Sequence, residues 1–160
     1  MARQRKYIRL KGGIKMDRIS KHQYYIEIAK KVALRSTCKR NKIGSIIIDP
    51  NLEDLILGTG YNDSLSGKNH CSENKFSCMF EDHCIYTTHA EINALRRALF
   101  SNIVLNGKIM YSTHSPCYGC IKTIAAFGIN TIYYEKLYKD EAALRYAELT
   151  GINLIQISLE

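Results

Sequence analysis

The chain has 160 residues, enough for one domain with a sizeable buried core. No apolar run approaches the length of about 18 residues that a membrane-spanning helix needs, and the N-terminus is charged, without the apolar stretch of a secretion signal. We therefore expect a soluble, cytoplasmic protein, in which the six cysteines are metal ligands or free thiols rather than disulfides.

The net charge of +8 is unevenly distributed, because residues 1–22 hold eight of the 23 Lys and Arg residues and one of the 15 acidic residues. We interpret residues 1–19 as a flexible basic extension and residues 20–160 as one domain. Such an extension favours weak contact with polyanions such as nucleic acid. We favour the simpler interpretation, a solvated tail or an extension ahead of a natural start near Met16.

The first predicted elements are a helix and a hairpin. A helix is predicted from about residue 22 to residue 35, because apolar residues recur there at helical spacing. Residues 43–49 are β-branched and apolar, residues 50–51 begin a turn, and residues 54–60 continue as a partner strand. Residues 61–87, in contrast, are rich in Asn, Ser, Gly, Cys and His. They are too irregular for a regular element and too long for an ordinary connection, so something other than backbone pairing must hold them.

The second half of the chain alternates helices and strands. Thr88 is the predicted N-cap of a helix with an apolar stripe, and Glu91 has the spacing of a capping box. The later elements are a strand at 108–113, a helix that follows residues 115–120 and runs to about 127, a strand at 131–134, a helix at 140–149 and a strand at 152–157. Helices between the last strands imply parallel crossovers, so we predict an α/β fold, a three-layer α/β/α sandwich whose mixed five-stranded sheet is flanked by helices.

Two short segments supply a set of metal ligands. If Pro116 opens a helix, the sulfurs of Cys117 and Cys120 lie on its first turn and face the same way. With His89 as the third ligand, Zn²⁺ keeps its fourth tetrahedral position open to water, which distinguishes a catalytic site from a structural one.

Glu91 is the residue that favours catalysis at this site, because water activated by a metal needs a nearby carboxylate to take its proton. The combination of H-x-E with P-C-x-x-C is typical of zinc-dependent base deaminases. The alternatives are a structural zinc site and, for Glu91, a role in helix capping.

These segments resemble the cytidine deaminase superfamily and, within it, the deoxycytidylate (dCMP) deaminases of bacteria and bacteriophages. The resemblance covers nearly all of residues 20–158. It depends on Arg35-Ser36-Thr37-Cys38, Ile43-Gly44-Ser45, Gly60-Tyr61-Asn62, His89 to Ala94, Ser115-Pro116-Cys117 with Cys120, and Tyr133-Tyr134.

The resemblance implies a cytidine deaminase-like fold and zinc-dependent hydrolysis of dCMP to dUMP and ammonia, which supplies dUMP for thymidylate synthesis. Glu91 would transfer the protons. The backbone N–H of Ala90 would contact the base carbonyl, Asn62 the sugar, and Ser115 would shape the base pocket. Asn62 also fits a turn residue, because Gly60-Tyr61-Asn62-Asp63 is good turn chemistry.

Other expected contacts concern phosphate groups and effectors. Candidates for binding the 5′-phosphate are Arg35, Lys136, Tyr138 and Lys139, although solvated surface charge explains any single lysine among them. The resemblance further implies a homo-oligomer, of hexameric type, with dCTP and dTTP as effectors. The family usually has glycine where this chain has Asp63, and a carboxylate is unfavourable near an anionic nucleotide.

The remaining cysteines form a second group. Cys38, Cys71, Cys78 and Cys84 could close an all-thiolate structural zinc site, with His83 or His70 able to replace one ligand. The resemblance supports Cys38 and Cys71 in particular. Such a metal would explain how residues 61–87 stay ordered, whereas buried thiols without a metal are the alternative.

Two other classes of function share these motifs. A tRNA adenosine deaminase has the same ligand signature and would benefit from a basic extension. A zinc or nucleotide-binding protein without enzymatic activity could keep the fold, although the presence of Glu91 favours catalysis.

Overall fold

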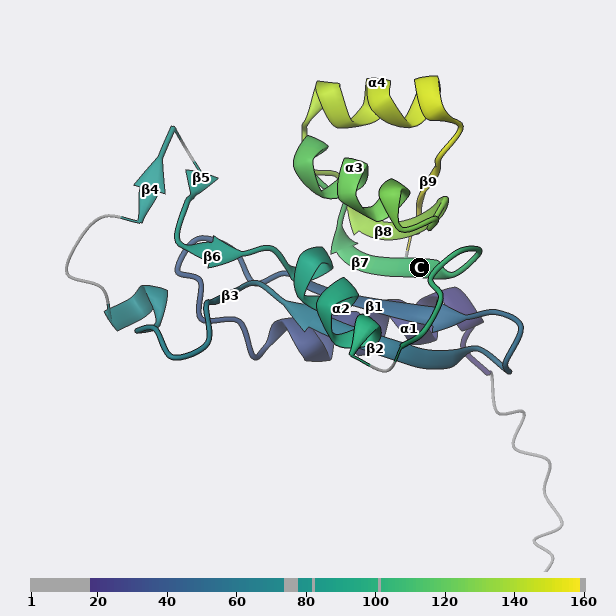
Figure 1. Ribbon diagram of the computed structural model, residues 1–160, viewed down its shortest axis with the longest axis horizontal. Coiled ribbons are helices and arrows are strands. Elements are labelled where there is room, and N and C mark those ends of the chain that lie inside the picture. Colours follow the sequence, from purple (N-terminus) through teal and green to yellow (C-terminus); the bar gives the residue numbers. More distant parts are fainter. Residues whose placement is uncertain (1–17, 74–77, 82, 101, 159–160) are drawn as a thin grey trace, which may run out of the picture.

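The computed structural model describes residues 18–73, 78–81, 83–100 and 102–158, and it confirms the predicted mixed five-stranded sheet (Figure 1). The strand order is β2-β1-β7-β8-β9. Strand β1 pairs antiparallel with β2 and β7, while β7, β8 and β9 run parallel to one another. The bounds are β1 Gly44–Asp49, β2 Leu55–Tyr61, β7 Ile109–His114, β8 Thr131–Lys136 and β9 Asn153–Gln156.

The connections explain these directions. A short turn, with Glu53 and Asp54 at positive φ, joins β1 to β2, so the two strands form the predicted hairpin. The helices α3 (Tyr118–Ala126) and α4 (Glu141–Thr150) lie between the parallel strands and provide the predicted crossovers. Gly151, at φ 70°, ends α4 with the left-handed conformation that glycine adopts easily.

Helices cover both faces of the sheet (Figure 1). Helix α1 (Lys21–Ala33) packs on one face, and α2 (Ala90–Leu99), α3 and α4 form the other layer. Alternate strand residues therefore enter different cores. Ile46, Ile48 and Tyr111 pack with Tyr25, Ile26 and Ala29 of α1, while Ile47, Met110 and Ile132 pack with Leu95, Ile121 and Ile124. The three-layer prediction is thus confirmed.

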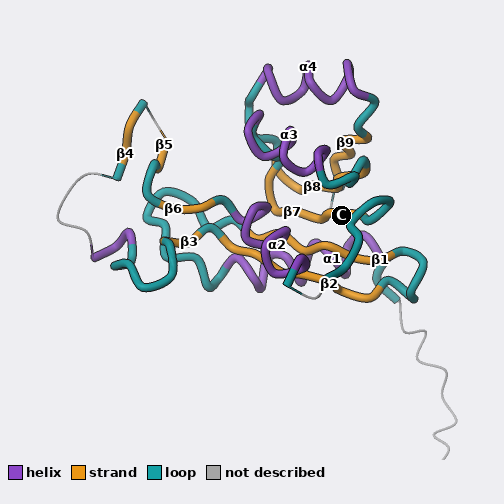
Figure 2. Tube along the Cα trace, viewed as in Figure 1, coloured by secondary structure: helices purple, strands orange, loops and turns teal. Residues whose placement is uncertain are grey.

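The described residues between 61 and 87 form an arm that extends from one end of the sheet (Figure 2). The prediction of no regular elements is wrong in part, because short strands pair within the described residues of the arm. The elements are β3 Asp63–Ser64, η1 Cys71–Glu73, β4 Met79–Phe80, β5 His83–Cys84 and β6 Thr87–Thr88. Strand pairs of two residues bury little apolar surface and are not stable on their own. Contacts between side chains must therefore supply most of the stability of the arm.

Two predicted helix starts need correction. Thr88 belongs to β6, and His89 is the N-cap of α2, without a side-chain capping hydrogen bond. Pro116 precedes α3, whose N-cap is Cys117, so Cys117 lies just before the first turn rather than on it. In both cases the capping position goes to a predicted metal ligand whose side chain makes no capping hydrogen bond.

Close packing of α2 on β2 fixes the start of α2. A Cβ atom on Gly60 would lie 2.0 Å from the backbone oxygen of Ala90 and 2.3 Å from the nitrogen of Ala94. Only glycine permits this approach. The buried Asn93 adds a hydrogen bond of 2.9 Å from its Nδ2 to the oxygen of Tyr61.

No helix among the described residues is both long and apolar enough to cross a lipid bilayer. Nearly all of the predicted basic extension at residues 1–19 lies outside the described residues.

Candidate metal centre and catalytic pocket

The structure brings the three predicted zinc ligands together. The Nδ1 atom of His89 lies 3.2 Å from the Sγ atom of Cys120 and 3.5 Å from that of Cys117. All three ligand atoms lie within 4.8 Å of one another. Two thiols and one imidazole at this spacing fit the donors and the short bonds of a tetrahedral zinc site with one position left for water.

Two helix N-termini meet at this centre. His89 and Cys117 both have extended backbones, with ψ 153° and 168°, and each accepts the first hydrogen bond of its helix through its carbonyl oxygen. Their side chains therefore leave from the positive ends of α2 and α3. This partial positive charge favours the thiolate form that metal binding requires.

The pKa values of the two cysteines are shifted in opposite directions. The hydrogen bond from Cys120, opposed by burial and reinforced by His89, lowers the pKa of Cys117 to about 4. The same contact with Cys117, together with burial, raises the pKa of Cys120. The hydrogen bond with Cys117 also raises the pKa of His89, against the effect of burial. Cys117 is thus the more readily ionised thiol, and a divalent cation would favour loss of the Cys120 proton as well, so that two thiolates balance its two positive charges.

The carboxylate of Glu91 lies directly beside these ligands. Glu91 is only 4% exposed, and its Oε2 atom lies 3.7 Å from the Sγ atom of Cys120. Burial raises the pKa of Glu91. A carboxyl group held in this way exchanges protons closer to neutral pH than an exposed one. Its contact with Cys120 places the carboxyl group at the metal centre, where it can serve chemistry rather than capping.

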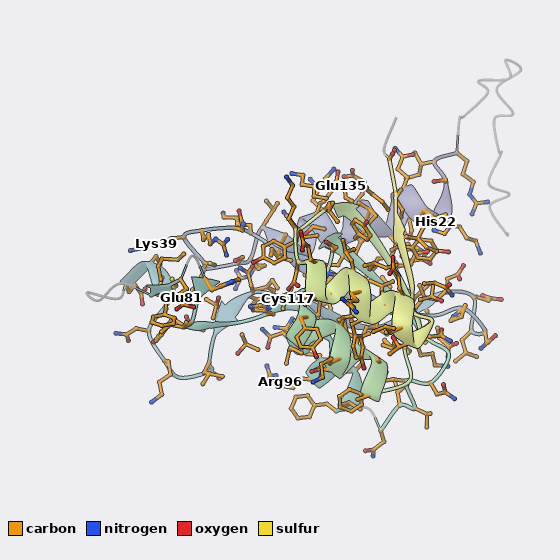
Figure 3. The ribbon with its side chains drawn as sticks, turned by 90° about the horizontal axis from the view of Figure 1, so that it is seen from above. His22, Lys39, Glu81, Arg96, Cys117 and Glu135 are labelled. Atoms are coloured by element: carbon orange, nitrogen blue, oxygen red, sulfur yellow. The ribbon has the colours of Figure 1, made fainter. Side chains whose placement is uncertain are left out.

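A single pocket connects this centre to the arm and to the segment before β1. Residues from six parts of the chain line it: Cys38, Arg40, Asn41, Ile43, Asn62, His83, Cys84, Thr87, His89, Ala90, Glu91, His114, Ser115, Cys117 and Tyr138. In Figure 3, Cys117 lies at the start of α3, between the arm with Glu81 and the body of the domain. Five of the lining residues, Arg40, Asn41, Ile43, Thr87 and His114, were not among the predicted site residues.

Asn62 lines the pocket, but its amide group is bonded to protein. Its Oδ1 atom accepts a hydrogen bond of 2.8 Å from the nitrogen of Ile43, and its Nδ2 atom donates one of 2.7 Å to the oxygen of Asn41. Ser36 Oγ donates to its backbone oxygen at 2.8 Å. Asn62 therefore holds the pocket wall at residues 36–43, and any contact with a sugar would be additional to that role.

Ser115 and Tyr138 also occupy the pocket, and they hold each other. Ser115 Oγ accepts a hydrogen bond of 2.7 Å from the nitrogen of Tyr138 and donates one of 3.2 Å to its oxygen. The hydroxyl of Tyr138 lies 3.3 Å from Nδ1 of His83 in the arm. This chain of contacts links the metal-binding segment to the arm across the pocket.

The predicted phosphate contacts separate into two groups. Tyr138 and the newly found Arg40 line the pocket, whereas Arg35 is exposed and is not among the lining residues. Lys136 and Lys139 are exposed at and just after the end of β8. A side chain's place in the pocket depends on tertiary structure, which sequence spacing alone does not give.

The second group of cysteines gathers in the arm. The sulfurs of Cys38, Cys71 and Cys84 lie within 4.8 Å of one another, and the Cys78 sulfur lies 3.0 Å from that of Cys71. All four are free thiols. Burial of Cys84 acts against ionisation, yet hydrogen bonds from Thr87 and the Tyr86 backbone lower its pKa to about 6. Three mutually close sulfurs, with a fourth 3.0 Å from one of them, favour an all-thiolate zinc site over buried thiols without a metal.

The two predicted histidine alternatives lie elsewhere. His83 contacts Tyr138, and Nδ1 of His70 lies 3.8 Å from a carboxylate oxygen of Asp63. Neither joins the sulfur group formed by the described cysteines. The Asp63 carboxylate also accepts hydrogen bonds from Thr37 Oγ1 and from the nitrogen of Ser64, so it is occupied within the arm.

Comparison with known proteins gives a consistent result. A model of the cytidine and deoxycytidylate deaminase zinc-binding region matches residues 19–136. The chain is 37% identical over 146 residues to ComE operon protein 2 of Bacillus subtilis (strain 168), covering 91% of this chain and 75% of that protein. It is 32% identical over 131 residues to the deoxycytidylate deaminase of Mycobacterium phage D29, covering 76% of this chain and 98% of the phage protein.

A solved structure is also similar. The dCMP deaminase of the cyanophage S-TIM5, crystallised with dCMP and dUMP, superposes with a TM-score of 0.71 at 29% identity. The match covers 84% of this chain and 95% of that structure.

Proposed function

Because this chain belongs to the cytidine and deoxycytidylate deaminase family, we propose that it catalyses the zinc-dependent hydrolysis of dCMP to dUMP and ammonia. The product dUMP would then be available for thymidylate synthesis. The observation that supports the proposal most strongly is the buried Glu91 carboxylate beside the His89, Cys117 and Cys120 ligand set, in one pocket. A structural zinc site would have no use for that carboxylate.

In this proposal His89, Cys117 and Cys120 would hold Zn²⁺, which as a Lewis acid would lower the pKa of water to about 7. Glu91 accepts a proton from the attacking water as the oxygen adds to C4 of the base, and it delivers that proton to N3. Glu91 then takes the second proton of the same oxygen and transfers it to the amino group. Ammonia leaves and the C4 carbonyl forms, so atoms and protons balance.

Burial suits Glu91 for this work. A carboxyl group with a raised pKa is both a stronger base and able to hold a proton near neutral pH. The backbone N–H of Ala90, at the first residue of α2, is the proposed donor to the base carbonyl. Ser115 acts through Tyr138, whose backbone it holds, and Asn62 acts through Asn41 and Ile43.

The proposal includes a second, structural zinc. Cys38, Cys71, Cys78 and Cys84 are its ligands, supported by their sulfur distances and by the free state of all four thiols. This metal would hold the arm, in which the described strands are only two residues long.

We extend the proposal to assembly, regulation and location, on the basis of the family resemblance. The chain would be a cytoplasmic homo-oligomer, of hexameric type, with dCTP and dTTP as effectors. Light scattering gives the number of subunits, and assays with each triphosphate give the response. Asp63 is bonded to Thr37 and Ser64, so its negative charge is fixed near any effector that binds there.

An ammonia-release assay over dCMP, CMP, dCTP, deoxycytidine and tRNA tests the function. We expect turnover with dCMP above all others, and two zinc ions per chain in the same preparation. Turnover of tRNA alone would instead favour the nucleic-acid deaminase alternative. If all five compounds stay unchanged at micromolar enzyme, the proposal is wrong.

A further inference from the structure

His114 is a pocket residue that the proposed proton transfers do not use. It is the last residue of β7, it is half-buried, and its ring lines the same pocket as Glu91. Nothing in the family motif requires a histidine for the metal or for the proton transfers. The role of His114 must therefore be inferred from its hydrogen bonds and from the charged groups around it.

A chain of hydrogen bonds fixes which ring nitrogen carries the proton. The nitrogen of Gly44 donates to Thr113 Oγ1 at 3.2 Å, and Thr113 Oγ1 lies 3.1 Å from Nδ1 of His114. Thr113 is 4% exposed, and among the described residues Nδ1 is the only acceptor within hydrogen-bond distance of its hydroxyl. The hydroxyl therefore donates to Nδ1, because its proton would otherwise be buried without a partner. The neutral ring then carries its proton on Nε2, where it is a donor for the pocket.

The charges around His114 favour an anion. Burial, followed by the positive charge of Lys136, lowers the pKa of His114, so the ring is neutral near pH 7. His114 pairs in register with Lys136 on the neighbouring parallel strand, so their side chains leave the sheet on the same face. Glu135 opposes this shift, but its carboxylate is bonded to Lys30 at 3.1 Å, beside α1 on the opposite face (Figure 3).

The position within the fold agrees with this charge pattern. The carboxyl ends of parallel strands are the usual ligand-binding edge of α/β sheets, and β7 and β8 both end here. The reacting end of the pocket carries Glu91, the only carboxylate among its lining residues. A neutral hydrogen-bond donor beside a lysine would add little to the affinity for an uncharged nucleoside. A phosphate monoester, in contrast, is bound by hydrogen-bond donors and by positive charge together.

We propose that His114 is a specificity-determining residue that donates a hydrogen bond from Nε2–H to the 5′-phosphate of the nucleotide, with Lys136 supplying positive charge beside it. This inference rests on the proposed function, because it identifies how the same pocket distinguishes a nucleotide from a nucleoside.

The test compares binding of the product dUMP with that of deoxyuridine, by calorimetry on the zinc-loaded full-length protein. Neither compound can be deaminated, so the result does not depend on turnover. His114→Leu removes the donor, and His114→Gln keeps an N–H near the position of Nε2. We expect His114→Leu to weaken dUMP binding by about 10- to 100-fold, the range for a hydrogen bond to a charged group. Deoxyuridine binding should stay unchanged, and His114→Gln should recover most of the lost dUMP affinity.

Lys136→Met should weaken dUMP binding more modestly and reduce its dependence on salt, because Lys136 is exposed. Lys31→Met, an exposed lysine on α1, is the matched control and should bind both compounds normally. Equal losses for dUMP and deoxyuridine in His114→Leu would assign His114 to the base or to folding, and no loss would remove it from recognition. Either result overturns the inference. A wild-type protein that binds dUMP selectively but does not deaminate dCMP would refute the proposed function alone.

Discussion

Replacing Glu91 by glutamine is the sharpest single change that the structure suggests. The substitution keeps the size of the side chain and removes its ability to accept and deliver protons. Positioned proton transfer by one group contributes about 10²–10⁴-fold to a rate, so kcat for dCMP should fall by at least about 100-fold. Because Glu91 would act twice in each turnover, the upper part of this range is the expected result.

The same structure predicts what Glu91→Gln leaves intact. Burial raises the pKa of Glu91, which means that the fold disfavours its ionised form. An uncharged glutamine should therefore leave the melting temperature equal or slightly higher. His89, Cys117 and Cys120 remain in place, so zinc content should not change.

The assay measures dUMP formation, metal content and thermal unfolding on the same preparations. Glu148→Gln, an exposed glutamate on α4, is the matched control and should keep full activity. If Glu91→Gln retained more than about a tenth of the wild-type kcat, the assignment of Glu91 as the proton carrier would be refuted. Loss of zinc in proportion to loss of activity would show instead that Glu91 serves the metal site.

Three further changes test the fold and the second metal site. The hydrogen bond from Lys108 lowers the pKa of Asp49 in the folded protein. The carboxylate therefore stabilises the fold at pH values above its unfolded pKa, and this stabilisation is lost as the pH falls through its folded pKa. In urea unfolding, the difference in unfolding free energy between wild type and Asp49→Asn should become smaller below about pH 4. Gly60→Ala should lower the melting temperature sharply because its Cβ would clash with the backbone of α2, whereas Gly119→Ala, with open space in α3, should be neutral or stabilising by about 0.5–1 kcal/mol. Cys71→Ser should reduce the zinc count from two per chain to one, and an unchanged count would argue against a metal in the arm.

The sheet could be predicted because its signals are local. Apolar β-branched runs identified the strands, and the helices between the later strands required parallel crossovers. Helix α4 ends at Thr150, one residue beyond its predicted end, with Gly151 as its C-cap. The helix starts at Thr88 and Pro116 were misplaced because local capping preferences compete there with tertiary demands. His89 and Cys117 take the N-cap positions while their side chains meet across the site.

The site was predictable to the extent that it follows a short motif. His89, Glu91, Cys117 and Cys120 were predicted from their spacing together with the H-x-E and P-C-x-x-C motifs, and the structure brings them together. The pocket walls were less accessible to sequence reasoning. Arg40 and His114 belong to no sequence motif. They line the pocket because β1 pairs with β7 and because Asn62 accepts a hydrogen bond from the segment before β1. A histidine beside the P-C-x-x-C segment was the one signal that could have been noticed.

The measurement that tests the central claim most directly is deamination of dCMP in water enriched in oxygen-18. Hydrolysis at C4, with Glu91 moving the protons, predicts dUMP that carries one labelled oxygen on the base, formed together with one equivalent of ammonia. Ammonia without label in the base, or no dUMP from a zinc-loaded preparation, would contradict it.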